Sequence, residues 1–165
     1  MNAPAPVRAY IALGSNLGDS ATLVRDAMVA LGRLPGTRLV AASGLYLTPP
    51  WGMTEQPSFV NAVAGVETTL APKALLEALL DTERAFGRVR DGERWGPRTL
   101  DLDLLLHGDR VLDEEGLTLP HPRLAERAFV LLPLAEIAPA LDIPGKGRVA
   151  DLLARLDAAG CTAIP

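Results

Sequence analysis

Two kinds of hydrophobic periodicity alternate along the first two thirds of the chain, and their order limits the possible folds more than any other feature. Short apolar runs rich in β-branched and aromatic residues predict strands, whereas apolar residues three and four positions apart predict helices. The expected strands are 7–14, 37–47 with an interruption near Gly44, 59–70 and 99–108, and the expected helices are 19–34 and 71–87. The order strand, helix, strand, strand, helix, strand indicates an α+β fold with a ferredoxin-like βαββαβ core, in which both helices cover one face of an antiparallel sheet.

The remaining third of the chain predicts smaller elements. We expect a short hairpin within 110–124, a helix within 125–139 that breaks at Pro133, and a terminal helix within 148–160. Proline lacks the backbone N–H that a helix interior uses, which is the reason for the expected break.

Composition limits the class of protein. The chain has 165 residues, 48% of them hydrophobic, so we expect one domain spanning 1–165. A formal net charge of −4 argues against non-specific nucleic-acid binding. Cys161 is the one cysteine, which excludes an internal disulfide. No apolar run approaches the length of a membrane span or a signal peptide, so we expect a cytoplasmic protein without a membrane partner.

Two long irregular segments, 48–58 and 88–98, interrupt the regular elements. The second segment and the helix end before it carry five arginines within fifteen residues: Arg84, Arg88, Arg90, Arg94 and Arg98. Guanidinium groups are forked donors that suit phosphate oxygens. The sequence therefore predicts a local anion site next to the strand that follows.

That strand carries Asp101 and Asp103 at alternate positions between leucines. Strand side chains alternate between faces, so both carboxylates point one way and the leucines point into the core. Two like charges about 6 Å apart repel by roughly 3 kcal/mol at an effective dielectric constant near 20. A solvated acidic face is the ordinary explanation for such a pair. With the arginines nearby, the alternative is a magnesium site that also binds phosphates.

Other polar residues have two explanations each. Glu83 lies on the apolar stripe of the second helix, either at its boundary or as a partner for an arginine or a substrate donor. His121 lies between two prolines, in a turn or against a phosphate. Phe59 and Asn61 share one face of the third strand, where they pack in the core or present an aromatic ring and an amide to a flat heterocycle.

Several segments resemble, in the same order, those of the 6-hydroxymethyl-7,8-dihydropterin pyrophosphokinase family. They cover nearly the whole chain: "AYIALGSNLGD", "YLTPPWG", "QPSFVNAV", "FGRVR", "RWGPRTLDLDLL", "LTLPHPRL" and "RAFVLLPLAEIAP". The resemblance implies transfer of the β,γ-pyrophosphoryl group of ATP to the hydroxymethyl oxygen of the pterin, with release of AMP, in folate biosynthesis. It also implies that the partners are ATP and 6-hydroxymethyl-7,8-dihydropterin, and we expect a monomer.

The resemblance also implies roles for individual residues. Asp101 and Asp103 would hold magnesium, as two ions that bridge the ATP phosphates, and Arg88 and Arg98 would stabilise the charge in transit. The nucleotide side would be formed by Glu83, Arg88, Arg94, Trp95, Arg98, Thr118 and His121. The pterin side would be formed by Thr48, Pro50, Trp51, Phe59, Asn61, Asp101 and Phe129, with the two phenylalanines stacked on the ring.

Two departures from the family pattern affect these roles. Asp91 stands where some relatives carry a basic residue, which places more of the phosphate binding on Arg88, Arg90 and Arg94. Trp51 stands where a smaller aliphatic residue is expected, so its contact with the pterin is open.

Two other functions share the predicted topology. A nucleotidyl-transferring palm domain would use the same aspartate pair but release pyrophosphate and need a nucleic-acid template, which the acidic net charge and small size disfavour. A non-catalytic sensor domain would bind a small molecule without forming AMP, and it gives no reason for the arginine-rich segment.

Overall fold

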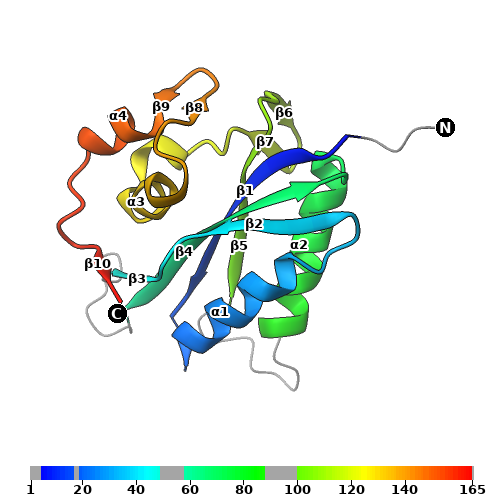
Figure 1. Cartoon of the computed structure of the whole chain (residues 1–165), viewed down its shortest axis with the longest axis horizontal. Helices are drawn as coiled ribbons and strands as arrows, with labels where there is room; N and C mark the ends of the chain where they lie inside the picture. Colours follow the sequence, from blue (N-terminus) through cyan, green and yellow to red (C-terminus); the bar gives the residue numbers. More distant parts are fainter. Residues whose placement is uncertain (1–4, 17–18, 49–57, 88–99, 165) are drawn as a thin grey trace.

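The computed structural model describes residues 5–16, 19–48, 58–87 and 100–164 and confirms the α+β class (Figure 1). The first part of the chain forms β1 (Val7–Ser15), α1 (Ser20–Leu31), β2 (Thr37–Ala42), β3 (Tyr46–Thr48), β4 (Phe59–Thr68), α2 (Pro72–Gly87) and β5 (Asp101–His107). The second part forms β6 (Leu112–Glu114), β7 (Leu117–Leu119), a 3-10 turn (Leu124–Glu126), α3 (Ala128–Ile137), β8 (Asp142–Ile143), β9 (Gly147–Arg148), α4 (Val149–Ala154) and β10 (Thr162–Ala163).

The main sheet has the strand order β10, β3, β4, β1, β5, and β2 also pairs with β4. Each pairing in it is antiparallel. Strands β2 and β3 together cover the predicted strand 37–47, with the interruption near Gly44 where it was expected. Strand β4 is central and β5 lies at one edge of the sheet.

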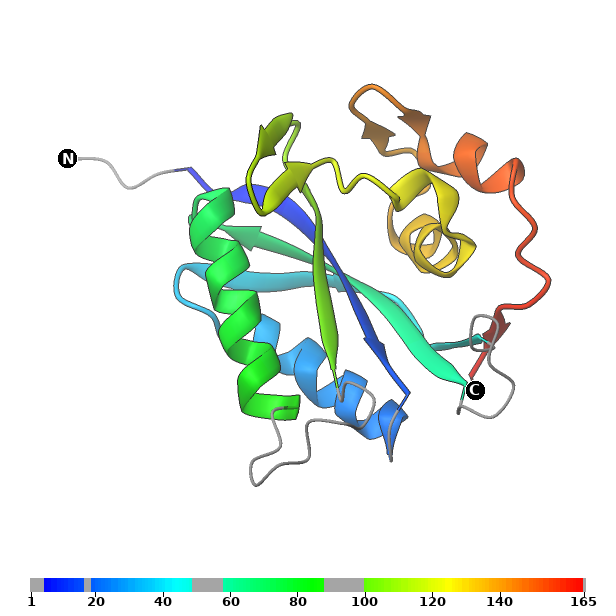
Figure 2. The same cartoon turned by 180° about the vertical axis from the view of Figure 1, so that it is seen from behind.

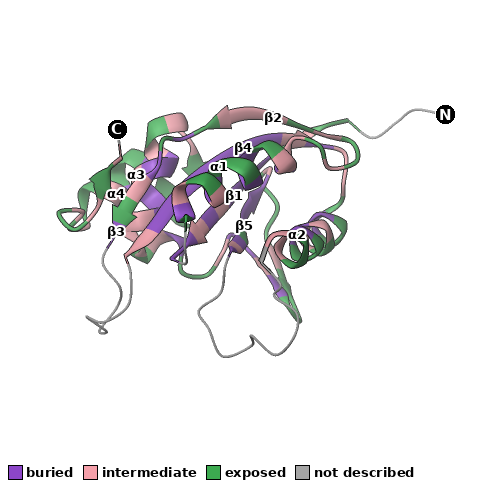
Figure 3. Ribbon diagram, turned by 90° about the horizontal axis from the view of Figure 1, so that it is seen from below, coloured by how far each residue is buried: buried purple, intermediate pink, exposed green. Residues whose placement is uncertain are grey.

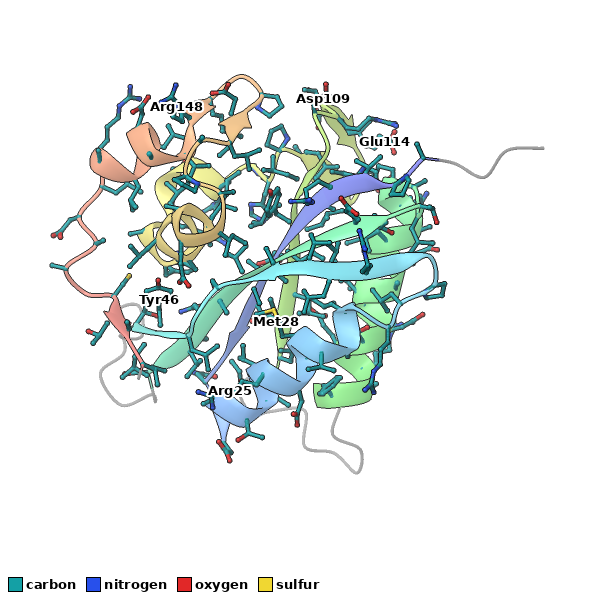
Figure 4. All side chains as sticks on the ribbon, viewed as in Figure 1. Arg25, Met28, Tyr46, Asp109, Glu114 and Arg148 are labelled. Atoms are coloured by element: carbon teal, nitrogen blue, oxygen red, sulfur yellow. The ribbon has the colours of Figure 1, made fainter. Side chains whose placement is uncertain are left out.

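Helices α1 and α2 cover one face of the sheet, and α3 and α4 lie on the other (Figures 1 and 2). Alternation along β1 sends Ile11 and Leu13 into the core under α1 and α2, and Tyr10 and Ala12 into a second cluster with α3 and α4. In Figure 4, Met28 lies between α1 and the sheet, where it is 6% exposed. Each face of the sheet therefore has its own apolar core.

The side chains of β5 also alternate between the two faces of the sheet, which confirms the prediction that its leucines and its aspartates point in opposite directions. Its leucines Leu102 and Leu104 lie in the core under α1 and α2. Of the alternate residues, Asp101 is half-buried and Asp103 is exposed. Both line a cavity on the α3 side of the sheet. A strand period of two thus separates the apolar face of β5 from its acidic face.

The pattern of buried and exposed residues matches the layered arrangement of the sheet and its helices. Figure 3 shows the central strands buried over most of their length, while α1 and α2 expose their outer faces. Asp19 caps α1 by accepting a hydrogen bond from the Thr22 N–H, which has no acceptor within the helix. Among the described residues, no helix is long and apolar enough to cross a membrane.

Two expectations for the last third of the chain were wrong. Helix α3 does not break at Pro133 but continues through it to Ile137, because Leu131 and Leu134 on either side are fully buried against the sheet and hold the helix in place. The terminal helix is only Val149–Ala154 rather than 148–160, because Val149 and Leu152 are its only buried residues. The hairpin of β8 and β9 and the strand β10 were not predicted.

Candidate active site

A cavity of about 220 Å³ lies between the sheet and the N-terminal turn of α3. Strands β1, β3, β4 and β5 form its floor, and α3 with the residue before it forms its wall. The lining residues are Ala12, Leu13, Gly14, Thr48, Phe59, Asn61, Ala62, Asp101, Asp103, Arg127, Phe129 and Val130. This first cavity brings together each predicted pterin residue that lies in the described part of the chain.

The polar floor of the first cavity depends on Gly14 of β1. Gly14 pairs with Asn61 of β4 on one side and with Asp101 of β5 on the other. A Cβ atom at this position would lie 3.1 Å from Asn61 Oδ1, closer than side chains normally approach. Asn61 is 7% exposed, and its Nδ2 donates a hydrogen bond of 2.8 Å to Thr48 Oγ1. The amide is therefore held with its oxygen toward Gly14.

The two aspartates face small residues across the sheet. Asp101 pairs with Gly14, and Asp103 pairs with Ala12. Neither neighbour fills the space above the strands, so both carboxylates reach the first cavity. Carboxylate oxygens are the ligands that Mg²⁺ prefers, and one or two of them with phosphate oxygens complete a typical site. Among the described residues, no three or more histidine, cysteine or acidic side chains are arranged to hold a metal ion, so an ion at this pair would need further oxygen ligands from a bound molecule.

Glu83 holds the backbone between these aspartates. Its Oε2 accepts a hydrogen bond of 2.7 Å from the Leu102 N–H. Because β5 is the edge strand, N–H groups on its outer side have no neighbouring strand to pair with. Glu83 satisfies one such group, so its carboxylate contacts the strand from α2 at the level of the acidic pair.

A second cavity of about 300 Å³ lies around the edge of β5, between α2 and the hairpin of β6 and β7. Asp103 lines it as well as the first cavity. The other lining residues are Leu76, Leu102, Leu104, Gly116, Leu117, Thr118, His121 and Pro122. Thr118 and His121, both predicted on the nucleotide side, therefore line the same cavity. This second cavity shares Asp103 with the first.

Burial governs the protonation of His121. Removal from water lowers the pKa of its imidazole below the ordinary 6.5, the negative charge of Asp103 opposes this, and Arg127 and Arg123 lower the pKa further. The Arg123 N–H donates to His121 Nδ1 at 3.2 Å. In the neutral ring the proton is therefore on Nε2, which leaves an N–H donor on that side.

A pH prediction follows for His121. Unfolded histidine binds its proton near pH 6.5, whereas folded His121 does so only at lower pH. Its contribution to stability is therefore fully present above pH 6.5 and is lost as the pH falls through the lower folded-state pKa. We expect wild type to lose more unfolding free energy than His121→Asn between pH 7.5 and pH 5, measured by urea denaturation. Equal losses in both proteins would contradict the lowered pKa.

Seven predicted residues lie outside the described residues: Pro50, Trp51, Arg88, Arg90, Arg94, Trp95 and Arg98. Sequence reasoning missed six others that line the first cavity: Ala12, Leu13, Gly14, Ala62, Arg127 and Val130. Arg127 has extended backbone before α3, and its guanidinium carbon lies 5.6 Å from the centre of the Phe129 ring. The signal for Arg127 was its place in the segment "RAFVLLPLAEIAP", two residues before a predicted ring-stacking residue.

Fold and site together define a class of protein, an α+β protein with two cavities that share a carboxylate at the edge of an antiparallel sheet. Comparison with known proteins gives the family. Residues 10–139 match the family model described as 7,8-dihydro-6-hydroxymethylpterin-pyrophosphokinase (HPPK). The chain belongs to this family, which confirms the resemblance found in its sequence segments.

Curated relatives match over nearly their whole length. The chain is 50% identical to the 2-amino-4-hydroxy-6-hydroxymethyldihydropteridine pyrophosphokinase of Pseudomonas aeruginosa, over 96% of this chain and 97% of that protein. It is also 50% identical to the protein of that name from Methylorubrum extorquens, over 93% of this chain and 96% of the relative. The protein of the same name from Haemophilus influenzae is 45% identical over 89% and 91% of the two chains.

Solved structures share the fold at low sequence identity. A triple mutant of Plasmodium falciparum HPPK-DHPS superposes with a TM-score of 0.74 at 14% identity, over 91% of this chain and 44% of that chain. An HPPK-DHPS in complex with substrates gives a TM-score of 0.73 at 12% identity, over 92% and 43%. This chain therefore spans less than half the length of those solved chains.

Proposed function

We propose that this chain transfers the β,γ-pyrophosphoryl group of ATP to the hydroxymethyl oxygen of 6-hydroxymethyl-7,8-dihydropterin, giving AMP and the pterin diphosphate in folate biosynthesis. The family supplies the reaction class. The observation in the structure that carries the proposal is the meeting of two cavities at Asp103. Group transfer requires donor and acceptor to lie side by side in a fixed orientation, and this arrangement provides it.

The pterin binds in the first cavity. A flat heterocycle with ring nitrogens and a carbonyl needs apolar faces and in-plane hydrogen-bond partners. Phe59 and Phe129 supply the faces, while Asn61, Thr48 and the Asp101 carboxylate supply polar contacts at the floor. We assign Pro50 and Trp51 to the same side from the family pattern. The cavity volume of about 220 Å³ suits one small bicyclic ring.

ATP binds in the second cavity, with its phosphates directed toward Asp103. Thr118 and the Nε2–H of His121 are donors there. Arg88, Arg94, Trp95 and Arg98 belong to the segment that joins α2 to β5, and we assign them to the nucleotide together with Glu83. Arginine forks suit the oxygens of a triphosphate, and Arg88 and Arg98 stabilise the charge that moves during transfer.

We assign the binding of Mg²⁺, as two ions, to Asp101 and Asp103, whose carboxylates would hold it next to the ATP phosphates. When bound, magnesium neutralises phosphate charge and draws electron density from the phosphorus under attack. The residues of the chain do the positioning. Asn61 and Thr48 orient the pterin. Its hydroxymethyl oxygen attacks the β-phosphorus and releases its proton to water, the bond from that phosphorus to the oxygen shared with the α-phosphate breaks, and AMP leaves with that oxygen. Such a transfer depends mainly on alignment and electrostatics.

Broader proposals accompany this function. We assign the core to the ferredoxin-like topology and residues 1–165 to a single pyrophosphokinase domain. We also propose that the protein acts as a cytoplasmic monomer with no nucleic-acid partner, which gel filtration with light scattering and a nucleic-acid binding assay would test.

One assay tests the function. Protein, Mg²⁺, ATP and 6-hydroxymethyl-7,8-dihydropterin are mixed, and the products are separated by chromatography. We expect AMP and a pyrophosphorylated pterin in equal amounts, and we expect excess EDTA to stop their formation. ADP would indicate a simple kinase, free pyrophosphate a nucleotidyltransferase, and no product a binding domain, so each of these would overturn the proposal.

The contact from Glu83 to β5 gives a second prediction. Glu83→Ala leaves the Leu102 N–H without its acceptor. Losing that hydrogen bond costs about 1–3 kcal/mol of unfolding free energy, and the loosened backbone lowers kcat about tenfold, a change equivalent to about 1.4 kcal/mol in the barrier. Glu83→Gln keeps an oxygen acceptor and should recover most of both losses. Denaturant unfolding and steady-state kinetics measure the two effects. An alanine variant with wild-type kcat would show that Glu83 does not support the acidic strand.

A further inference from the structure

Strand β3 is three residues long and supplies Thr48 to the first cavity. So short a strand is held in place only by its neighbours. On one side Tyr46 and Thr48 pair with Asn61 and Phe59 of β4, and on the other side β3 pairs with β10. The direction of β3 therefore sets the position of Thr48 relative to Asn61.

The Glu136 carboxylate of α3 accepts hydrogen bonds from the chain at the start of β3. The Gly44 N–H lies in the break between β2 and β3 and donates to both carboxylate oxygens of Glu136, at 3.1 Å and 3.0 Å. The Tyr46 hydroxyl donates to Glu136 Oε1 at 2.6 Å. One side chain thus holds a backbone donor before β3 and a side-chain donor within it. In Figure 4, Tyr46 is labelled at β3, next to helix α3.

The same helix forms the opposite wall of the first cavity. Phe129 and Val130 line the cavity from the first turn of α3, and Glu136 lies in its last turn. Glu136 therefore connects two elements that approach the cavity from different sides, α3 with its ring and β3 with its hydroxyl. A change in their separation would change the space between Phe129 and Thr48.

We propose that Glu136 is a positioning residue for the pterin subsite, which it sets by tying α3 to the start of β3; this inference rests on the proposed function. Glu136 joins β3 to α3, whose residues Thr48 and Phe129 line the first cavity but not the second, so we expect its effect on the pterin side. Burial, followed by the hydrogen bond to Glu136, raises the pKa of Tyr46 to about 12. The phenol therefore stays protonated and remains a donor at any pH suitable for assay.

A purely structural role would give a different result from a positioning role. Glu136 is exposed, and α3 is anchored independently by Leu131 and Leu134, which are fully buried. Loss of the carboxylate should therefore leave the helix folded and change the geometry of the cavity. If Glu136 had a purely structural role, its loss would instead lower the melting temperature and weaken the binding of both substrates together.

The experiment compares four full-length variants with wild type: Glu136→Ala, Glu136→Gln, Tyr46→Phe and the control Glu77→Ala, which removes an exposed glutamate from α2. We measure kcat and the KM of each substrate, and melting temperature checks folding. We expect Glu136→Ala to raise the KM for the pterin about tenfold, the change expected from about 1.4 kcal/mol of lost interaction. The KM for ATP should stay within about twofold. Glu136→Gln should recover most of the loss, Tyr46→Phe should give a smaller rise, and Glu77→Ala should match wild type.

Each other outcome overturns the inference. Wild type that forms AMP, with the pterin KM unchanged in both Glu136→Ala and Tyr46→Phe, would refute the positioning role and leave the proposed function intact. Equal rises in both KM values would assign Glu136 a structural role. If Glu136→Ala does not fold, Tyr46→Phe decides the question by the same criteria. Wild type that forms no AMP would refute the proposed function and this inference with it.

Discussion

Replacing Asp103 with alanine is expected to lower kcat about a hundred- to a thousandfold, the loss typical when a group that organises transition-state charge is removed. Asp103 lines both the first cavity, which we assign to the pterin, and the second cavity, which we assign to ATP. It is exposed and faces Ala12, so no packing depends on it. Removing it also relieves its repulsion with Asp101, so the melting temperature should hold or rise.

The controls for this variant separate charge from shape. Asp103→Asn keeps the size of the side chain but loses its charge, and we expect nearly the same loss of kcat as with alanine. Asp109→Ala removes an exposed aspartate from the turn after β5, away from both cavities, and should leave kcat unchanged (Figure 4). Normal turnover by Asp103→Ala would refute the assignment of the aspartate pair to magnesium.

Filling the first cavity should abolish pterin binding and spare ATP. Ala12 lines the first cavity but not the second. Ala12→Trp places an indole in the cavity that we assign to the heterocycle, and we expect pterin affinity to fall at least about a hundredfold, equivalent to about 2.8 kcal/mol. Calorimetry with an ATP analogue that carries a methylene group between the α- and β-phosphorus should show affinity within about threefold of wild type.

A reciprocal variant makes this test specific. Thr118→Trp fills the second cavity and should weaken the ATP analogue while sparing the pterin. Ala42→Trp adds the same indole at an exposed position of β2 and should change neither affinity. If Ala12→Trp and Thr118→Trp weakened the same ligand, the two cavities would not be separate subsites.

Periodicity explains why so much of the site could be predicted from sequence. A strand places alternate residues on one face, so Asp101 and Asp103 had to lie together once 99–108 was recognised as a strand. The same rule placed Phe59 and Asn61 along one strand of the sheet. These inferences need only local sequence, and the structure confirms that all four residues line one cavity.

Features that depend on distant contacts could not be predicted in the same way. The importance of Gly14 lies in its pairing with both Asn61 and Asp101, which local sequence does not specify. Helix α3 passes through Pro133 because tertiary packing outweighs the local cost of proline. Strand β10 has two residues and owes its conformation to β3, so no local signal for it exists.

The position of β5 at the edge of the sheet has a further consequence, for solubility. An exposed edge strand is a template on which another molecule can add a strand and begin aggregation. Charged side chains on the strand and occupied outer N–H groups oppose such pairing, and β5 has both, through Asp103 and through the bond from Leu102 to Glu83. Asp103 and Glu83, which we assign to magnesium and to the nucleotide, thus also oppose pairing of this edge with the sheet of a neighbouring molecule.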